Sequence, residues 1–107
     1  MTTAGELLDC SKFDRGSVID VRTKSRHYQL ECLGGDVIRI SGHPDFCPTP
    51  VLAQLRGSLS HEGKLKQGLI VRGMRLVFEC FDGPGPVTTS EIIGVDTEST
   101  MHDRMAA

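Results

Sequence analysis

The chain is poor in aromatic residues and has no stretch long enough to cross a membrane. Its 107 residues include no tryptophan, and aromatic residues make up only 5%, so an aliphatic core is expected. No apolar run approaches the ~18 residues of a membrane-spanning helix. The N-terminus, "MTTAGELLDC", lacks the basic and apolar regions of a secretory signal. We therefore expect one domain, located in the cytoplasm and without a membrane partner.

Motifs that bind metals, phosphates or cofactors are also missing. The four cysteines contain no Cys-x-x-Cys pair, and without a secretory signal we expect all of them to be free thiols. The glycine-proline stretch "GPGP" (83–86) resembles a stiff connector, because neither a lysine nor a helix follows it as in a phosphate-binding loop. We expect no cofactor.

What is present is a period-two alternation of apolar residues, which is typical of β-strands with one buried face. The segment "HYQLECL" shows it best, with Tyr28, Leu30 and Cys32 on one side. The sequence Gly34-Gly35-Asp36 predicts a tight hairpin turn. Strands are predicted at residues 17–23, 27–33, 37–41, 51–58, 75–81 and 88–95.

The remaining segments are harder to assign. Thr3 and Glu6 have the spacing of a capping box, which predicts a short helix at 4–10. Residues 57–74 contain four glycines and are interpreted either as a long hairpin or as including a short strand at Leu69–Val71. Residues 96–107 have little apolar content and are expected to form a flexible tail.

These elements predict an all-β, mainly antiparallel domain over residues 1–95: a small barrel of about five to seven short strands with a short N-terminal helix. This order resembles the small barrels of Sm-like and SH3-like proteins, and in general character the chain is similar to small bacterial proteins. The Asp-x-apolar-Asn feature of Sm-like RNA sites has no counterpart, since "CLGGD" follows "YQLE". The resemblance therefore implies a fold and no RNA-binding residues.

The stretch "SGHPDFCPTP" (41–50) places His43 and Cys47 four residues apart. A zinc site needs about four ligands, and this pair stands alone. A cysteine nucleophile would need Cys47 as a thiolate, His43 or His61 as its base and a group such as Asp45 to orient that base. The prolines at 44, 48 and 50 remove amide donors from this loop. We therefore expect no enzyme, and keep a cysteine-dependent or metal-binding site at His43 and Cys47 as an alternative.

The same prolines predict a stiff, extended loop. Phe46 is its one large apolar side chain, and it either anchors the loop to the barrel or points toward a partner. Cys47 is expected to react with alkylating reagents at an ordinary rate. The loop at 42–50 and a basic hairpin around 59–68 are therefore the predicted recognition surface.

Basic residues gather in two stretches although the net charge is −2. The first is "RTKSRHY", and the second runs from Arg56 to Arg75 with five basic residues against one acid, Glu62. If the two stretches met on one face, that face could contact nucleic-acid phosphates. Nucleic-acid binding is thus the first alternative function.

The function expected from the sequence is a binding or assembly module that acts through loops and strand edges on a protein partner or on itself. Val77 and Phe81 are further apolar residues at outward positions of a strand. They either cover a second sheet layer or form an interface, or a closed barrel buries them together with the N-terminal helix. The candidate partner-binding residues are His43, Asp45, Phe46, Arg22, Lys24, Arg26, Lys64 and Lys66.

Overall fold

A computed structural model of the protein describes residues 7–97, and these form a β structure with one short 3-10 helix, η1. The elements in chain order are β1 (Leu7–Asp9), η1 (Cys10–Lys12), β2 (Val18–Thr23), β3 (His27–Cys32), β4 (Val37–Ser41), β5 (Val51–Leu59), β6 (Leu65–Gln67), β7 (Leu69–Val71), β8 (Arg75–Cys80) and β9 (Pro86–Thr97).

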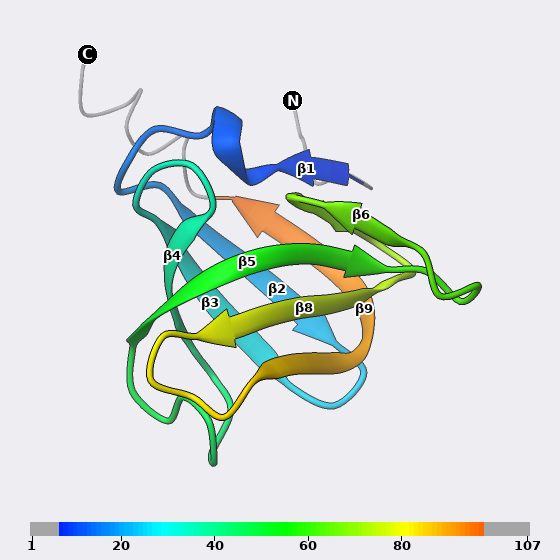
Figure 1. Cartoon of the computed structure of the whole chain (residues 1–107). Helices are drawn as coiled ribbons and strands as arrows, with labels where there is room; N and C mark the ends of the chain where they lie inside the picture. Colours follow the sequence, from blue (N-terminus) through cyan, green and yellow to red (C-terminus); the bar gives the residue numbers. More distant parts are fainter. Residues whose placement is uncertain (1–6, 98–107) are drawn as a thin grey trace.

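Six of these strands form a closed antiparallel barrel (Figure 1). The closed order around the wall is β2-β3-β4-β5-β8-β9, and β9 pairs again with β2. The register of the first hairpin aligns Ile19 with Leu30, and the pairing of β4 with β5 aligns Ile40 with Val51. The predicted all-β barrel is therefore confirmed, and its strands lie within a few residues of the predicted ranges.

The alternation of the sequence explains which side chains fill the barrel. Tyr28, Leu30 and Cys32, expected on one side of β3, are all buried in the core, and so are apolar residues of β2, β4 and β8. Two large aromatic side chains, Tyr28 and Phe78, meet edge to face inside it with ring centroids 5.9 Å apart. Such an aromatic contact contributes stability in addition to the burial of the aliphatic side chains around it.

Strand β5 is long because it serves two partners on the same edge. Its first half pairs with β4 and its second half with β6, while β8 runs along its other edge. Gly57 lies where β6 joins, at a φ of 138°. A Cβ atom there would collide with the carbonyl oxygen of Lys66, so the close approach of β6 requires glycine.

The predicted N-terminal helix is wrong in the part that the structure describes. Residues Leu7–Asp9 form β1, which pairs antiparallel with β7, and a single 3-10 turn follows. The capping-box residues Thr3 and Glu6 lie outside the described residues. The pairing buries Leu8 together with Ile70 of β7, and this long-range contact outweighs a weak local helix signal.

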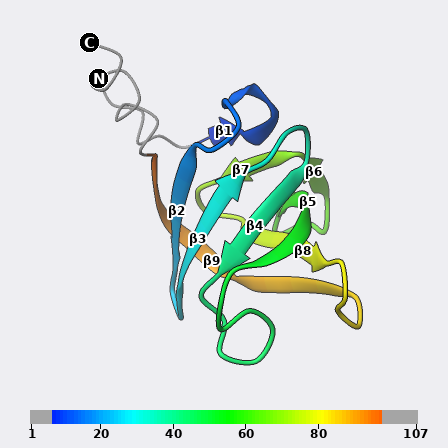
Figure 2. The ribbon, with the colours of Figure 1, turned by 90° about the vertical axis from the view of Figure 1, so that its left-hand side faces the viewer.

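The barrel has two unlike ends (Figures 1 and 2). At one end, called the closed end, lie β1, η1, β6 and the turn between β3 and β4. At the other, called the loop end, lie three connections: the β2–β3 turn (24–26), the β4–β5 loop (42–50) and the β8–β9 connection (81–85).

Strand β9 runs through Asp96 and Thr97 and pairs with β2 up to Ile19, two residues beyond the predicted end of the last strand. The rest of the predicted tail, residues 98–107, lies outside the described residues. No helix within residues 7–97 has the length and hydropathy to span a membrane.

Candidate functional site

The β4–β5 loop is closed on itself by backbone hydrogen bonds. The amide of Cys47 donates to the carbonyl of His43 at 3.0 Å, and the amide of Gly42 donates to the carbonyl of Cys47 at 2.9 Å. The imidazole Nδ1 of His43 accepts from the amides of Asp45 (3.0 Å) and Phe46 (3.3 Å). The loop therefore turns back sharply at residues 44–46, where the prolines had predicted an extended path.

The side chain of Cys47 is not at the surface, contrary to the prediction of ordinary reactivity. It is fully buried in the core, at 0% exposure, and this burial raises the pKa of its thiol. The short bridge to His43 turns the Cys47 side chain inward. A reactive thiolate needs exposure and a lowered pKa, so this position has the opposite character.

His43 is likewise committed to structure. Its Nδ1 atom accepts two backbone N–H groups, and its ring lies against the ring of Phe46 with centroids 4.7 Å apart. That nitrogen is thus occupied by backbone donors of its own loop. Among residues 7–97, no group of three or more His, Cys, Asp or Glu side chains could hold a metal ion.

Phe46 points outward and takes part in an apolar hollow at the loop end. Its side chain is 42% exposed, and those of Leu52 and Phe81 are 45% and 57% exposed. The backbone holds these residues together, because the amide of Phe81 donates to the carbonyl of Leu52 at 3.1 Å. The hollow has a volume of about 430 Å³ and is lined by Phe46, Val51, Leu52, Cys80, Phe81, Asp82 and Gly83.

The walls of this apolar hollow are held by short contacts on both sides. The amide of Gly83 donates to the carbonyl of Cys80 at 3.0 Å, which closes the turn after β8. The thiol of Cys80 lies 4.0 Å from the carbonyl oxygen of Phe46, which joins that turn to the β4–β5 loop. Two segments far apart in the sequence thus form one preformed concave surface.

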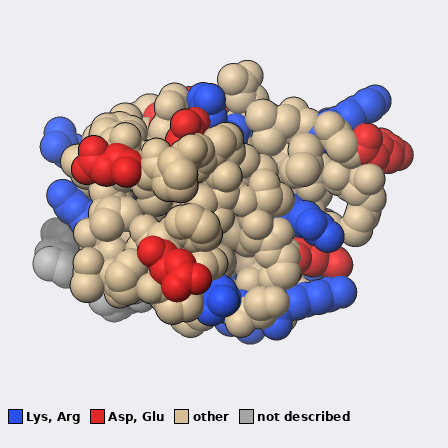
Figure 3. Space-filling model, turned by 60° about the horizontal axis from the view of Figure 1, so that its bottom comes forward, with Lys and Arg blue, Asp and Glu red and all other residues tan. Residues whose placement is uncertain are grey.

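The apolar hollow gathers an unusual share of the exposed apolar side chains. Of the six large hydrophobic residues exposed in the described chain, three line it. Figure 3, which brings the lower side of the barrel forward, shows a broad uncharged area with Lys, Arg, Asp and Glu side chains lying mainly around it. Uncharged apolar surface with a polar rim is typical of interaction sites.

The candidate basic residues divide between the two ends of the barrel. Arg22, Lys24 and Arg26 belong to the β2–β3 hairpin, at the loop end with His43, Asp45 and Phe46. Lys64 and Lys66 belong to the β5–β6 hairpin, and β5 lies opposite β2 in the closed strand order.

Acidic residues of β9 also balance part of the first basic set. Lys24 pairs with Glu91 at 3.2 Å and Arg22 with Asp96 at 3.7 Å. The structure therefore keeps Lys64 and Lys66 apart from the first basic stretch. Arg75 of the second stretch lies opposite Glu91, the partner of Lys24.

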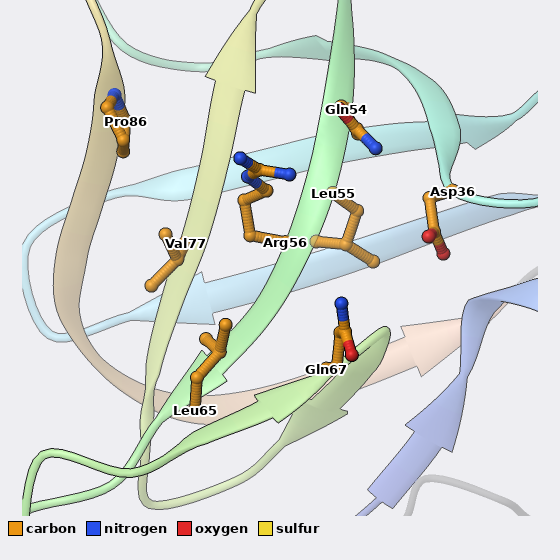
Figure 4. A pocket seen from close by; sticks show the side chains of 8 residues that line it. All are labelled: Asp36, Gln54, Leu55, Arg56, Leu65, Gln67, Val77 and Pro86. Carbon is orange, nitrogen blue, oxygen red and sulfur yellow. The ribbon is translucent and has the colours of Figure 1, made fainter.

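A second hollow, of about 370 Å³, lies on the outer side of β5 where it passes from β4 to β6 (Figure 4). Leu65 and Val77 point into the same space in that view. Val77 is thus buried under the β5–β6 hairpin. The remaining lining is mixed and includes Asp36, Arg56 and two glutamines, so this hollow lacks a continuous apolar surface.

Sequence reasoning identified Phe46 and Phe81 but not their partner Leu52. The signal for Leu52 was present: it is an apolar residue next to Ala53 in the predicted strand 51–58, and the period-two alternation puts neighbours on opposite faces. No protein-family model matches the chain, and no curated protein or solved structure matches it either. The candidate site therefore rests on its own geometry and chemistry.

Proposed function

We propose that this protein is a binding module that captures an apolar side chain of a protein partner in the apolar hollow at the loop end of the barrel. The observation that carries this proposal is the convergence of Phe46, Leu52 and Phe81, all strongly exposed, around one concave space of about 430 Å³. Soluble monomers rarely keep such apolar groups together on the surface without a use for them.

The chemistry of the apolar hollow favours an aliphatic or aromatic anchor residue. Its lining contains two phenylalanines, a leucine and a valine, and Asp82 is its single charged side chain. Protein interfaces place a few apolar anchors in such hollows and surround them with polar groups. A peptide segment that inserts one large apolar side chain would replace water at all of these groups.

The local backbone supports tight capture because it is already ordered. The His43–Cys47 bridge and the turn at Cys80–Gly83 hold the two walls through hydrogen bonds of 2.9–3.0 Å. A surface fixed before binding loses little conformational entropy when the partner arrives.

The proposal is tested with peptides, since these supply defined partners. A random peptide library is selected on the full-length protein, and the affinity of the recovered peptides is measured by fluorescence polarisation. Recovered sequences should share a large apolar residue. Phe81→Ser should weaken their binding by about tenfold or more, as expected for a central anchor contact.

Ile93→Ser is the matched control, because Ile93 is 43% exposed and is not among the residues that line the apolar hollow. Its affinity should stay within about twofold of the original. Equal losses in both variants, or a library that yields no apolar binder, would contradict the proposal. Sedimentation of the free protein provides the other check: a dimer that Phe81→Ser dissolves would show that the hollow takes a second copy of this chain.

A further inference from the structure

Two cysteines at the closed end lie in direct contact with each other. Cys10 comes from η1 and Cys32 from the end of β3, and their sulfur atoms are 3.3 Å apart. Both side chains are 1% exposed, and both are free thiols. A disulfide needs the sulfurs at about 2.05 Å, so a modest movement of one side chain would suffice to join them.

The backbone of Cys32 is paired with the segment that contains Gly16 and Ser17. Gly16 donates its amide to the carbonyl of Cys32 at 2.7 Å, and Cys32 donates its amide to the carbonyl of Ser17 at 2.8 Å. Gly16 has a φ of 95°, as a β-bulge with glycine in the left-handed region requires. This bulge places Ser17 across from Cys32, and the Ser17 hydroxyl is buried with no hydrogen-bond partner among residues 7–97.

The contact also shifts the pKa values of the two thiols in opposite directions. The hydrogen bond that the two thiols share lowers the pKa of Cys32, against the effect of burial and of the nearby Glu31. The same hydrogen bond and burial raise the pKa of Cys10, and the carboxylates of Asp36 and Asp9 raise it further.

We propose that Cys10 and Cys32 are a reversible dithiol–disulfide pair that reacts by exchange with small disulfides such as oxidised glutathione. The Cys32 thiolate attacks one sulfur of the oxidant and releases one thiol, which leaves a mixed disulfide on Cys32. The thiolate of Cys10 then attacks the Cys32 sulfur and releases the second thiol. Two protein thiols are oxidised to one disulfide, and one small disulfide is reduced to two thiols.

The reagent reaches this buried pair through the segment that carries Cys10. Within residues 7–97, β1 is hydrogen-bonded as a strand to β7 alone, over three residue pairs, and η1 is a single turn. Such a short peripheral segment opens at much lower free energy than the barrel wall. Opening lifts Cys10 away and uncovers Cys32, and oxidation then fixes the segment to the start of the β3–β4 turn.

The disulfide would close a loop between residues 22 positions apart. By the entropy that such a link removes from the unfolded chain, oxidation should raise the melting temperature by roughly 15 °C. The pair lies at the opposite end of the barrel from the apolar hollow, so oxidation should leave peptide binding there unchanged. This proposal is therefore independent of the proposed function.

The test exposes the native full-length protein to oxidised glutathione, quenches with acid, alkylates the remaining thiols and maps the peptides by mass spectrometry. The expected product has lost two hydrogen atoms and joins the peptides of Cys10 and Cys32. Dithiothreitol should restore both thiols and lower the melting temperature to that of the reduced protein.

Cys32→Ser should abolish the link, while the matched control Cys80→Ser should retain it. If either variant fails to fold, the disulfide map of the protein with its original sequence still tests the proposal. Persistence of four free thiols, under conditions in which the urea-unfolded chain oxidises, would overturn the proposal. A disulfide that used Cys47 or Cys80 in the native protein would overturn it as well.

Discussion

The two ends of this barrel are built from similar amounts of chain and finish in opposite ways. At the closed end, β1 and β7 pair with each other, and Leu8, Ile70 and Cys10 are buried in the core. At the loop end, three connections join neighbouring wall strands, and Phe46 and Phe81 remain 42% and 57% exposed. One end therefore extends the core, while the other presents apolar side chains to solvent.

The difference follows from where the backbone hydrogen bonds are made. The β4–β5 loop and the turn after β8 satisfy amides within themselves, through Cys47 to His43 and Gly83 to Cys80. These amides therefore require no hydrogen-bond partners from the rest of the barrel. Strand β7, in contrast, reaches both β1 and the Ser58 hydroxyl, which accepts from Val71 and donates to the carbonyl of Leu69. These bonds hold the β1–β7 ribbon across the barrel opening.

The two ends of the barrel therefore make different contributions to stability and to binding. A buried ribbon contributes to the stability of the fold, whereas exposed apolar groups on ordered loops contribute little to it and remain available for binding. The two ends should therefore respond very differently to the same kind of substitution.

The largest effect is expected at the closed end, from Ile70→Ala. Ile70 is fully buried, and truncating such a side chain removes apolar burial and leaves a cavity, at a cost of about 3 kcal/mol of unfolding free energy. Urea denaturation of the two proteins measures it. Leu7→Ala on the same ribbon is the control, because Leu7 is 54% exposed; its loss should stay below about 1 kcal/mol. A loss at Ile70 no greater than at Leu7 would remove the distinction between the ends.

The next effect concerns pH and the thiols near the loop end. Burial raises the pKa of both Cys47 and Cys80, so they stay protonated in the folded protein after the unfolded chain begins to ionise near pH ~8.5. The contribution of the two protonated thiols to the unfolding free energy is fully present below that pH and falls as the pH rises above it. Between about pH 8 and about pH 9.5, we expect the unfolding free energy to fall, with a contribution from each thiol.

Urea midpoints at a series of pH values give this slope. Cys47→Ala should make this slope shallower, even though the variant starts from a lower stability. At the closed end the pKa shifts of Cys10 and Cys32 have opposite directions, so their contributions oppose each other. A slope unchanged in Cys47→Ala would show that this thiol ionises equally in both states.

A smaller effect is expected from Phe46→Ala. Because Phe46 points outward at 42% exposure, its removal should lower the unfolding free energy by less than about 1 kcal/mol, while peptide binding in the apolar hollow should weaken. Phe78→Ala is the contrast, since Phe78 is fully buried against Tyr28; there the loss should be about 3 kcal/mol or more. A large loss of stability at Phe46 would mean that it anchors the loop.

The wall of the barrel was predictable from sequence because its signal is local. Strands β2, β3 and β4 alternate buried residues with exposed or half-buried ones, and the turn at Gly34-Gly35 separates two of them. The closed end was not predictable in the same way. Leu7 and Leu8 fit a helix or a strand equally well, and the choice depends on β7, more than fifty positions later in the chain.

The candidate site was likewise predictable only where its signal is local in the sequence. Phe46 and Phe81 could be singled out as apolar residues in exposed settings, but their meeting depends on the pairing of β5 with β8. The burial of Cys47 depends on a bridge across a five-residue turn. The prolines of this loop predicted an extended path and gave no sign of that bridge. The separation of Lys64 and Lys66 from Arg22 depends on closure of the barrel, which places β5 and β2 on opposite sides.

The smallest effect tests what holds the β2–β3 turn at the loop end. Its backbone is tied to β9, because the amide of Lys24 donates to the carbonyl of Glu91 at 2.9 Å and the amide of Ser25 donates to the hydroxyl of Ser90 at 3.0 Å. The ion pair between Lys24 and Glu91 lies largely in solvent, with the Lys24 side chain 64% exposed. Exposed pairs contribute little, so Lys24→Ala should change the unfolding free energy by less than about 0.5 kcal/mol. Ser90→Ala removes the acceptor for the Ser25 amide and should cost about 1 kcal/mol. Chemical denaturation at low and high salt separates the two: a salt-dependent loss at Lys24 that exceeded the loss at Ser90 would show that charge holds this turn to the barrel.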